Sequence, residues 1–197
     1  MNEDLRIIVK SKFNFYPVTK ENWKDFENLF GEKGACAGCW CMYWRMQRKD
    51  YDAQRGSGTK KKMRNLINSG TVPGILAYDS DIPVGWCSVA PREDFSVLEN
   101  SRVLQRIDDK PVWSIVCFFI NKSYRKKGLS VELLNAAKTY VKNNKGKLIE
   151  GYPTEPKKSK SADAFVWTGL ASAFKKAGFK EVIRRSETRP IMRFSIK

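Results

Sequence analysis

The sequence predicts a mixed α/β fold in which helices flank a central sheet. Stretches with the apolar pattern of strands alternate along the chain with stretches whose apolar residues recur at helical spacing. The most apolar run, residues 111–120, has no polar alternation and is typical of a strand buried on both faces. A short basic turn and a helical pattern follow it directly. A strand, turn and helix unit is therefore expected at the centre of the fold.

The other elements follow in order. The first half of the chain predicts a strand at residues 13–18, a helix with its N-cap at Thr19, a basic helix at residues 59–67, and paired strands at residues 75–78 and 83–90. After an irregular stretch, the second half predicts a helix at residues 133–141, strands at residues 147–151, 179–184 and 191–196, an exposed loop at residues 157–160, and a helix with Leu170, Phe174 and Ala177 on one face. No composition shift marks a linker, so residues 1–197 are expected to form a single domain.

Composition excludes several kinds of site. The 197 residues include 37 Lys and Arg against 21 Asp and Glu, a net charge of +16, and no histidine. Nucleophile systems and zinc sites that need an imidazole are therefore excluded. The positive charge suits nucleic acid, an anionic membrane surface or a phosphorylated small molecule. The first residues lack a secretory pattern and no apolar run has membrane-spanning length, so we expect a cytoplasmic protein with no membrane partner.

The basic turn at residues 124–130 has the features of an anion site. A helix begins there, and helix N-termini present unpaired N–H groups and a partial positive charge. Gly128 lets the backbone approach an oxyanion, and Arg125, Lys126 and Lys127 add charge. The turn lacks the order of a nucleotide P-loop and the glycines of the dinucleotide fingerprint. An ordinary basic helix start with a glycine fits the spacing equally well.

The segment FFINKSYRKKGLS resembles the acetyl-coenzyme A motif of the GNAT superfamily of N-acetyltransferases. That motif reads Gln or Arg, two residues, Gly, one residue, then Gly or Ala, and Arg125, Gly128 and Ser130 take those positions, with Ser130 as the departure. VGW at residues 84–86, KKAGF at residues 175–179 and the final strands also match in order. The resemblance implies a GNAT acyl-CoA N-acyltransferase fold, with a mixed, mostly antiparallel sheet of about six to seven strands splayed in its middle. It also implies direct transfer of an acetyl group from acetyl-CoA to an amine of a small molecule or peptide.

The same resemblance implies where acetyl-CoA binds. The strand ending at Ile120 would separate from the strand near residues 149–152, and the pantetheine arm would lie in the gap, bonded by the backbone of Phe118 and Ile120. The turn from Lys126 to Ser130 would hold the pyrophosphate. The expected cofactor-binding residues are Phe118, Phe119, Ile120, Arg125, Lys126, Lys127, Gly128, Leu129 and Ser130.

Proton transfer is assigned to Glu150 and Tyr152. Many members of the superfamily carry a tyrosine that serves as the general acid, and this chain has Phe174 at that position. Tyr152 is therefore proposed as the acid, with Tyr124 and Cys117 as alternatives. Glu150 is the expected base, because a carboxylate near the splay would face the cleft or a wall that raises its pKa. A Glu paired with a lysine is the structural alternative. Glu93, Asp94 and Glu155 are weaker candidates for the base.

The segment GCWCMYWR at residues 38–45 is expected to line the acceptor site. In the superfamily this region forms one wall, and Trp40, Met42 and Trp44 are the candidate substrate-binding residues. Core packing is the alternative. The cysteines of CAGCWC have the spacing of metal ligands, but without histidine a fourth ligand is hard to supply, so no metal is expected.

Two other functions remain open from the sequence. One is a domain that binds acyl-CoA without transferring the acyl group, an alternative that Phe174 keeps open. The other is a basic nucleic-acid-binding module, but the chain has no basic tail and no reader motif, so nucleic acid is not the expected partner. The acceptor, the acyl chain and the oligomeric state, including a homodimer, are left undetermined.

Overall fold

A single mixed sheet forms the centre of the computed structural model, which describes residues 2–156 and 166–197. Its strands are β1 (Asn14–Pro17), β2 (Gly74–Asp79), β3 (Ile82–Pro91), β4 (Trp113–Ile120), β5 (Leu148–Gly151), β6 (Lys180–Arg184) and β7 (Pro190–Ser195). The order across the sheet is β1-β2-β3-β4-β5-β7-β6. This arrangement confirms the expected mixed sheet and its number of strands.

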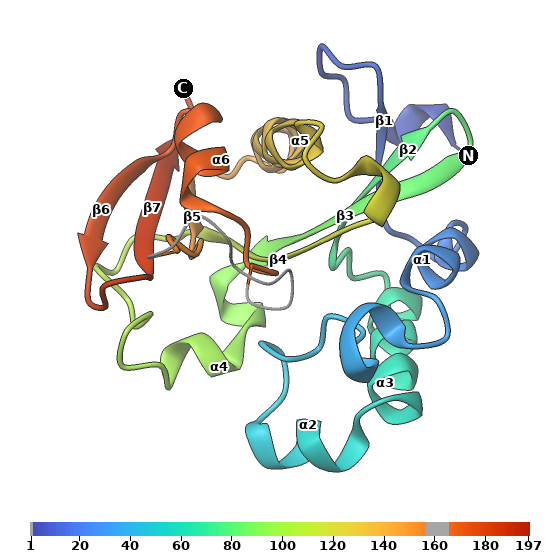
Figure 1. Cartoon of the computed structure of the whole chain (residues 1–197), viewed down its shortest axis with the longest axis horizontal. Coiled ribbons are helices and arrows are strands. Elements are labelled where there is room, and N and C mark those ends of the chain that lie inside the picture. Colours follow the sequence, from blue (N-terminus) through green and yellow to red (C-terminus); the bar gives the residue numbers. More distant parts are fainter. Residues whose placement is uncertain (1, 157–165) are drawn as a thin grey trace.

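Helices cover both faces of this sheet (Figure 1). The α-helices are α1 (Trp23–Phe30), α2 (Arg48–Gln54), α3 (Ser57–Asn68), α4 (Ser96–Glu99), α5 (Leu129–Asn143) and α6 (Ala171–Lys176). The described residues also form the short helical turns η1 (Glu3–Leu5), η2 (Gly34–Gly38), η3 (Arg92–Asp94) and η4 (Lys122–Tyr124). Helices α5 and α6 pack on one face, while α1 to α4 lie on the other. In the part of the chain that the structure describes, none of the helices has the length and apolar character needed to cross a membrane.

The parallel pair β4 and β5 is short, and this shortness opens the sheet. Pairing runs from Trp113 with Ile149 to Ile115 with Gly151 and then stops, although β4 continues to Ile120. All other neighbouring strands are antiparallel. The register of β3 against β4 also shifts beside Val89, which bends β4 at this level. The outer edge of β4 beyond Ile115 therefore faces a gap instead of a strand, confirming the expected splay.

Aromatic residues of α1 form much of the packing on the sheet face that α1 to α4 cover. The helical spacing of α1 places Trp23, Phe26, Leu29 and Phe30 together on the buried side. The predicted N-cap at Thr19 is wrong, because the helix begins after Asn22. The Asn22 side chain instead accepts a hydrogen bond from the Thr19 N–H at 2.8 Å and donates to the Pro17 carbonyl at 3.0 Å. The asparagine thus fixes the loop between β1 and α1.

The approach to α6 also differs from the prediction. The apolar spacing places Leu170 on the buried face of the helix, but Leu170 lies at the N-cap with 38% of its surface exposed. Its extended backbone pairs with Thr154, so the helix begins one residue later than the spacing indicates. Phe174 and Ala177 are buried as predicted. The exposed loop predicted at residues 157–160 lies outside the described residues.

Gly74 provides a test of the close packing between β2 and β3. A Cβ at this position would overlap the carbonyl of Cys87 and the indole of Trp86. We expect Gly74→Ala to lower the free energy of unfolding by roughly 3 kcal/mol, measured by chemical denaturation. Gly70→Ala is the control, because Gly70 has φ +88° but a Cβ there would meet nothing within 4 Å. The control should cost only about 1 kcal/mol of backbone strain. Equal losses at the two positions would contradict the packing explanation.

Candidate active site

The chain turns sharply between β4 and α5 and leaves a row of free amides. Lys126 and Gly128 both take left-handed backbone conformations, with φ of +60° and +85°. The N–H groups of Val131 and Glu132 close the first helical turn onto the Gly128 carbonyl. Across the described residues, the amides from Lys126 to Ser130 have no acceptor. Such a row at a helix N-terminus is a binding site for an anion.

The surroundings of this turn leave space for a ligand. Lys126, Lys127 and Gly128 are exposed, and a Cβ added at Gly128 would meet nothing within 4 Å. Leu129 is buried and anchors the start of α5 against β3 beside Gly85. Arg125 points the other way, because its Nε donates to the Ile120 carbonyl at 2.9 Å. The two lysines, not Arg125, therefore supply the exposed charge beside the free amides.

The outer edge of β4 is occupied by the protein's own chain. The N–H of Phe118 donates to the carbonyl of Trp167 at 2.6 Å. The segment that carries Trp167 is held to the end of β5, since the Thr154 N–H donates to the Gly169 carbonyl at 2.8 Å and the Ala171 N–H donates back to Thr154 at 3.0 Å. Backbone from residues 166–169 thus fills part of the gap between β4 and β5.

The side chains of β4 beside this edge face opposite layers. Phe118 packs edge-on against Phe174 at 6.0 Å, on the face covered by α5 and α6. Phe119 is half-buried on the other face and contacts Phe30 at 5.4 Å. The predicted cofactor-binding residues are therefore brought together as one strip, from the β4 edge to the start of α5. At Phe118, the atom that reaches across the gap is the backbone N–H.

Glu150 and Tyr152 lie together in a buried network of charges. Their exposed fractions are 1% and 0%. The Tyr152 hydroxyl donates to Glu150 Oε1 at 2.7 Å, and Arg92 donates to the same carboxylate oxygen at 3.2 Å and to Tyr152 at 2.6 Å. The second carboxylate oxygen accepts from Arg193 at 2.7 Å. Both oxygens of Glu150 are thus bound by protein groups, and the partners are arginines, not lysines.

This network continues outward from the sheet to the loop before β4. Arg92 also bonds Glu99 at 2.9 Å, and Arg193 makes two bonds to Asp108 at 2.7 and 3.0 Å. Burial raises the pKa of Tyr152, so its hydroxyl stays protonated. Each arginine lies between two carboxylates, which compensates the burial of Arg92 and the partial burial of Arg193. The network holds β5 against β4 and β7 at the point where the gap opens.

The three predicted substrate-binding residues occupy different environments. Trp40 is 2% exposed and packs within the core against Trp23 and Phe30. Met42 lines a surface pocket of about 510 Å³ that also contains Arg45, Lys62 and Asp94. Trp44 instead faces the segment in the gap, because its ring lies 5.7 Å from that of Trp167. Of the three, Trp44 is the residue that the fold places next to the gap.

Trp167 is the residue that sequence reasoning missed. Its ring contacts Tyr43 edge-on at 5.4 Å as well as Trp44, and the indole Nε1 of Trp44 is buried without a partner in the described residues. The next residue, Thr168, accepts a hydrogen bond from Arg189 at 2.8 Å. No periodic pattern marks residues 166–169, so only the recurrence of aromatic residues at Tyr43, Trp44 and Trp167 could have indicated the contact.

Two buried thiols lie next to each other: Cys117 on β4 and Cys41 from the loop after η2. Burial alone would raise the pKa of Cys41, but hydrogen bonds from Cys117, Trp86 and Ser88 and the charge of Arg45 outweigh it and lower that pKa. Trp86 Nε1 lies 3.3 Å from the Cys41 sulfur. All five cysteines are free thiols. Among residues 2–156 and 166–197, no group of acidic or cysteine side chains is arranged to hold a metal.

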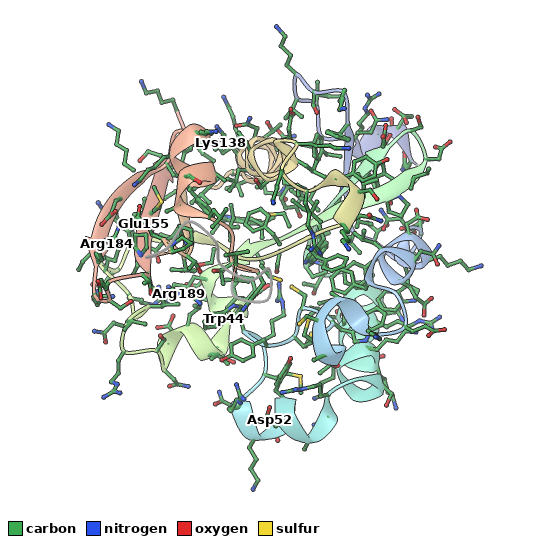
Figure 2. The ribbon with its side chains drawn as sticks, in the orientation of Figure 1. Trp44, Asp52, Lys138, Glu155, Arg184 and Arg189 are labelled. Carbon is green, nitrogen blue, oxygen red and sulfur yellow. The ribbon has the colours of Figure 1, made fainter. Side chains whose placement is uncertain are left out.

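The remaining carboxylate candidates lie at the surface in ion pairs. Glu93 bonds Arg106 at 2.9 Å, and Asp94 bonds Arg45 at 3.2 Å. Glu155 pairs with Lys175 and Arg184 beside α6 and β6, where Figure 2 shows Glu155 and Arg184 together. None of these three carboxylates belongs to the strip along the β4 edge.

Comparisons with known proteins identify the family to which this geometry belongs. A sequence profile of the acetyltransferase (GNAT) family matches residues 38–156, which is more than half of the chain. The chain belongs to the GNAT family of acetyltransferases. It is thus an acyltransferase of the kind that uses acetyl-CoA. No curated protein sequence matches it closely enough to add a substrate.

Solved structures support the GNAT fold. A GNAT family acetyltransferase from Streptococcus agalactiae has a TM-score of 0.55 and 10% identity, over 94% of this chain and 96% of the other. The PaiA N-acetyltransferase of Thermoplasma acidophilum, solved in complex with coenzyme A, has a TM-score of 0.53 and 14% identity, over 93% and 99%. The GNAT domain of S. lividans PAT has a TM-score of 0.55 and 10% identity, over 100% and 99%.

The outermost acid of the buried network predicts a pH dependence for this GNAT protein. Hydrogen bonds from Arg193 hold the pKa of Asp108 below its usual value. A lowered pKa in the folded state means that the carboxylate stabilises the fold above its unfolded pKa of about 4, and that this contribution is lost as the pH falls through the folded value. Asp108→Asn should therefore be less stable than the wild type near neutral pH, with the difference shrinking in acid.

Urea unfolding between about pH 3 and pH 7 measures this difference. Asp109→Asn is the matched control, because Asp109 is exposed and no ion pair to it is found among the described residues. It should change stability little at any pH. A loss in Asp108→Asn that stays constant down to the acid end would show that the carboxylate charge is not what Arg193 requires.

Proposed function

We propose that this chain transfers an acetyl group from acetyl-CoA to the amine of a small molecule or peptide, by direct attack of the amine on the thioester. The observation that carries the proposal is the row of free amides from Lys126 to Ser130, at the end of a strand whose outer edge has no neighbouring strand. These two features lie next to each other, as a ligand with a diphosphate and an extended amide-bearing arm requires.

In this proposal the amides and the two exposed lysines hold the diphosphate of acetyl-CoA. The backbone of Phe118 and Ile120 binds the pantetheine arm, as an added strand would be bound. Acetyl-CoA supplies an activated thioester carbonyl. The chain's part is to fix that carbonyl near the bend of β4 and to direct N–H groups toward the oxygen that becomes negative during attack.

The acceptor enters from the face covered by α1 to α4. Support comes from Tyr43, Trp44 and Trp167, whose rings lie together beside the gap on that face. Aromatic faces bind apolar groups and cations, so an amine with an apolar or positively charged portion suits this wall. Trp40 lies in the core and Met42 lines a separate surface pocket, so neither would touch the acceptor.

Glu150 and Tyr152 serve in this proposal as positioning residues for β5 and not as the groups that exchange protons with the amine. The support is their burial and the complete set of partners around both Glu150 oxygens. A base must reach the amine directly or through one water molecule. A carboxylate enclosed by Arg92, Arg193 and Tyr152 would first have to leave its network.

The proposal includes one domain acting in the cytoplasm. Strands from near both ends of the chain, β1 and β7, belong to the same sheet. The five thiols are free, as expected in a reducing compartment.

A second function is favoured by Phe174. The side chain has no proton to donate, and the gap contains the protein's own backbone, so the domain could bind acyl-CoA as a sensor without turning it over. An assay for free thiol with acetyl-CoA and a panel of amines separates the two. Thiol release that depends on an amine supports the enzyme, whereas tight binding without release supports the sensor.

The diphosphate site can be tested through thermal stability. A ligand that binds only the folded state raises the melting temperature, so acetyl-CoA should raise it for the wild type. The double variant Lys126→Gln with Lys127→Gln should bind roughly tenfold more weakly. Lys24→Gln with Lys49→Gln removes two other exposed charges, from α1 and α2, and should leave binding unchanged. No rise with the wild type at millimolar acetyl-CoA would refute the proposal.

Glu150→Gln separates a positioning role from a base. Removal of a buried charge between two arginines should destabilise the fold by roughly 3 kcal/mol and lower turnover through the displaced β5. The pH profile of kcat/KM should keep its shape, since the base lies elsewhere. A profile that loses its acidic limb in the variant, with stability intact, would instead make Glu150 the base.

A further inference from the structure

The segment at residues 166–169, here called the strap, takes the place of a strand beside β4. Its Trp167 carbonyl accepts from the Phe118 N–H at 2.6 Å, a short distance for such a bond. Its Gly169 carbonyl accepts from the Thr154 N–H beyond the end of β5. The strap is thus bonded to both sides of the gap that the splay of β4 and β5 opens.

The strap fits closely in the gap at Gly169 and is held by weaker contacts at Trp167. Gly169 has φ +88°, and a Cβ there would lie 2.9 Å from the Phe174 ring and 3.0 Å from Phe118. At Gly169 the backbone of the strap therefore lies so close to these two rings that a side chain would not fit. Trp167, in contrast, is half-buried, and its ring is held by the aromatic side chains of Tyr43 and Trp44. Edge-on and tilted ring contacts of this kind contribute little per pair and can be broken without unfolding the sheet.

We propose that the strap competes with the thioester end of the pantetheine arm for the Phe118 N–H, and that Trp167 thereby determines how tightly arm-bearing ligands bind. This inference rests on the proposed function, because it takes the gap to be the place of the arm. A backbone N–H directs one strong bond at a time, so the strap carbonyl must leave when the arm's carbonyl arrives. The free amides near Gly128 are not involved in this exchange.

The competition has a quantitative form. If only the fraction of molecules with the strap displaced accepts the arm, the apparent dissociation constant is the intrinsic one divided by that fraction. Weakening the strap raises this fraction and tightens binding of the whole cosubstrate. A ligand that occupies only the amides of the α5 turn gains nothing, because its site is open in both states.

Calorimetric titration with two probes tests this difference. One probe is coenzyme A, and the other is 3′-phosphoadenosine 5′-diphosphate, which has the diphosphate but lacks the arm. Trp167→Ala removes both ring contacts and should tighten coenzyme A by about fivefold to tenfold while leaving the armless probe unchanged. Leu170→Ala is the matched control, since this side chain next to the strap is exposed and its loss should affect neither probe.

Hydrogen exchange on the wild type provides a second measurement that needs no variant. The Thr154 N–H bonds the strap at Gly169. The strap is displaced as a unit in this proposal, so its Gly169 carbonyl also releases Thr154. Coenzyme A should therefore speed exchange at Thr154, whereas the armless probe should not. Equal changes in affinity for both probes on Trp167→Ala, or unchanged exchange at Thr154 on binding of coenzyme A, would overturn the role of the strap. If neither probe binds the wild type, the proposed function itself fails.

Discussion

The early end of the parallel pairing between β4 and β5 is the constraint on which the site depends. Strand pairing stops at Ile115 with Gly151, so the remaining half of β4 keeps an edge that needs partners inside the protein. Unpaired backbone groups at a buried edge are costly, and something has to bond them. Here the strap bonds the Phe118 N–H and Arg125 bonds the Ile120 carbonyl. A ligand that binds the edge of β4 therefore has to replace hydrogen bonds that the protein already makes there.

The buried charges explain how the strands can separate without loosening the sheet. Arg92 follows the end of β3, Glu150 comes from β5 and Arg193 from β7, and they meet one residue before the pairing of β4 and β5 ends. If the strands slid past one another, these charged groups would lose their partners and leave an uncompensated buried charge. The network therefore resists sliding of the strands. The network thus acts as a fixed end for the splay, and the gap widens only beyond it.

Sequence reasoning recovers the parts of this design that depend on local pattern. The apolar run of β4, the basic turn at Gly128 and the helical spacing of α5 each follow from neighbouring residues, and each is predicted within a few positions. The partners of Glu150 could not be predicted in the same way, because Arg92 and Arg193 lie 58 and 43 positions away along the chain. The contact of Trp167 with Phe118 could not be predicted for a related reason, since it uses backbone atoms, which any residue carries.

Phe174 connects the strap to the chemistry of the site. Its ring lies against Gly151 at the end of β5, Gly169 in the strap and Phe118 on β4, and it is fully buried. A Cβ at Gly151 would stand only 2.8 Å from the outermost ring carbon of Phe174, so the ring packs directly on the backbone at the end of β5. The phenyl ring is therefore part of the packing that admits the strap. A proton for the departing thiolate has to come from another group or from solvent, and displacement of the strap is the event that would let either approach.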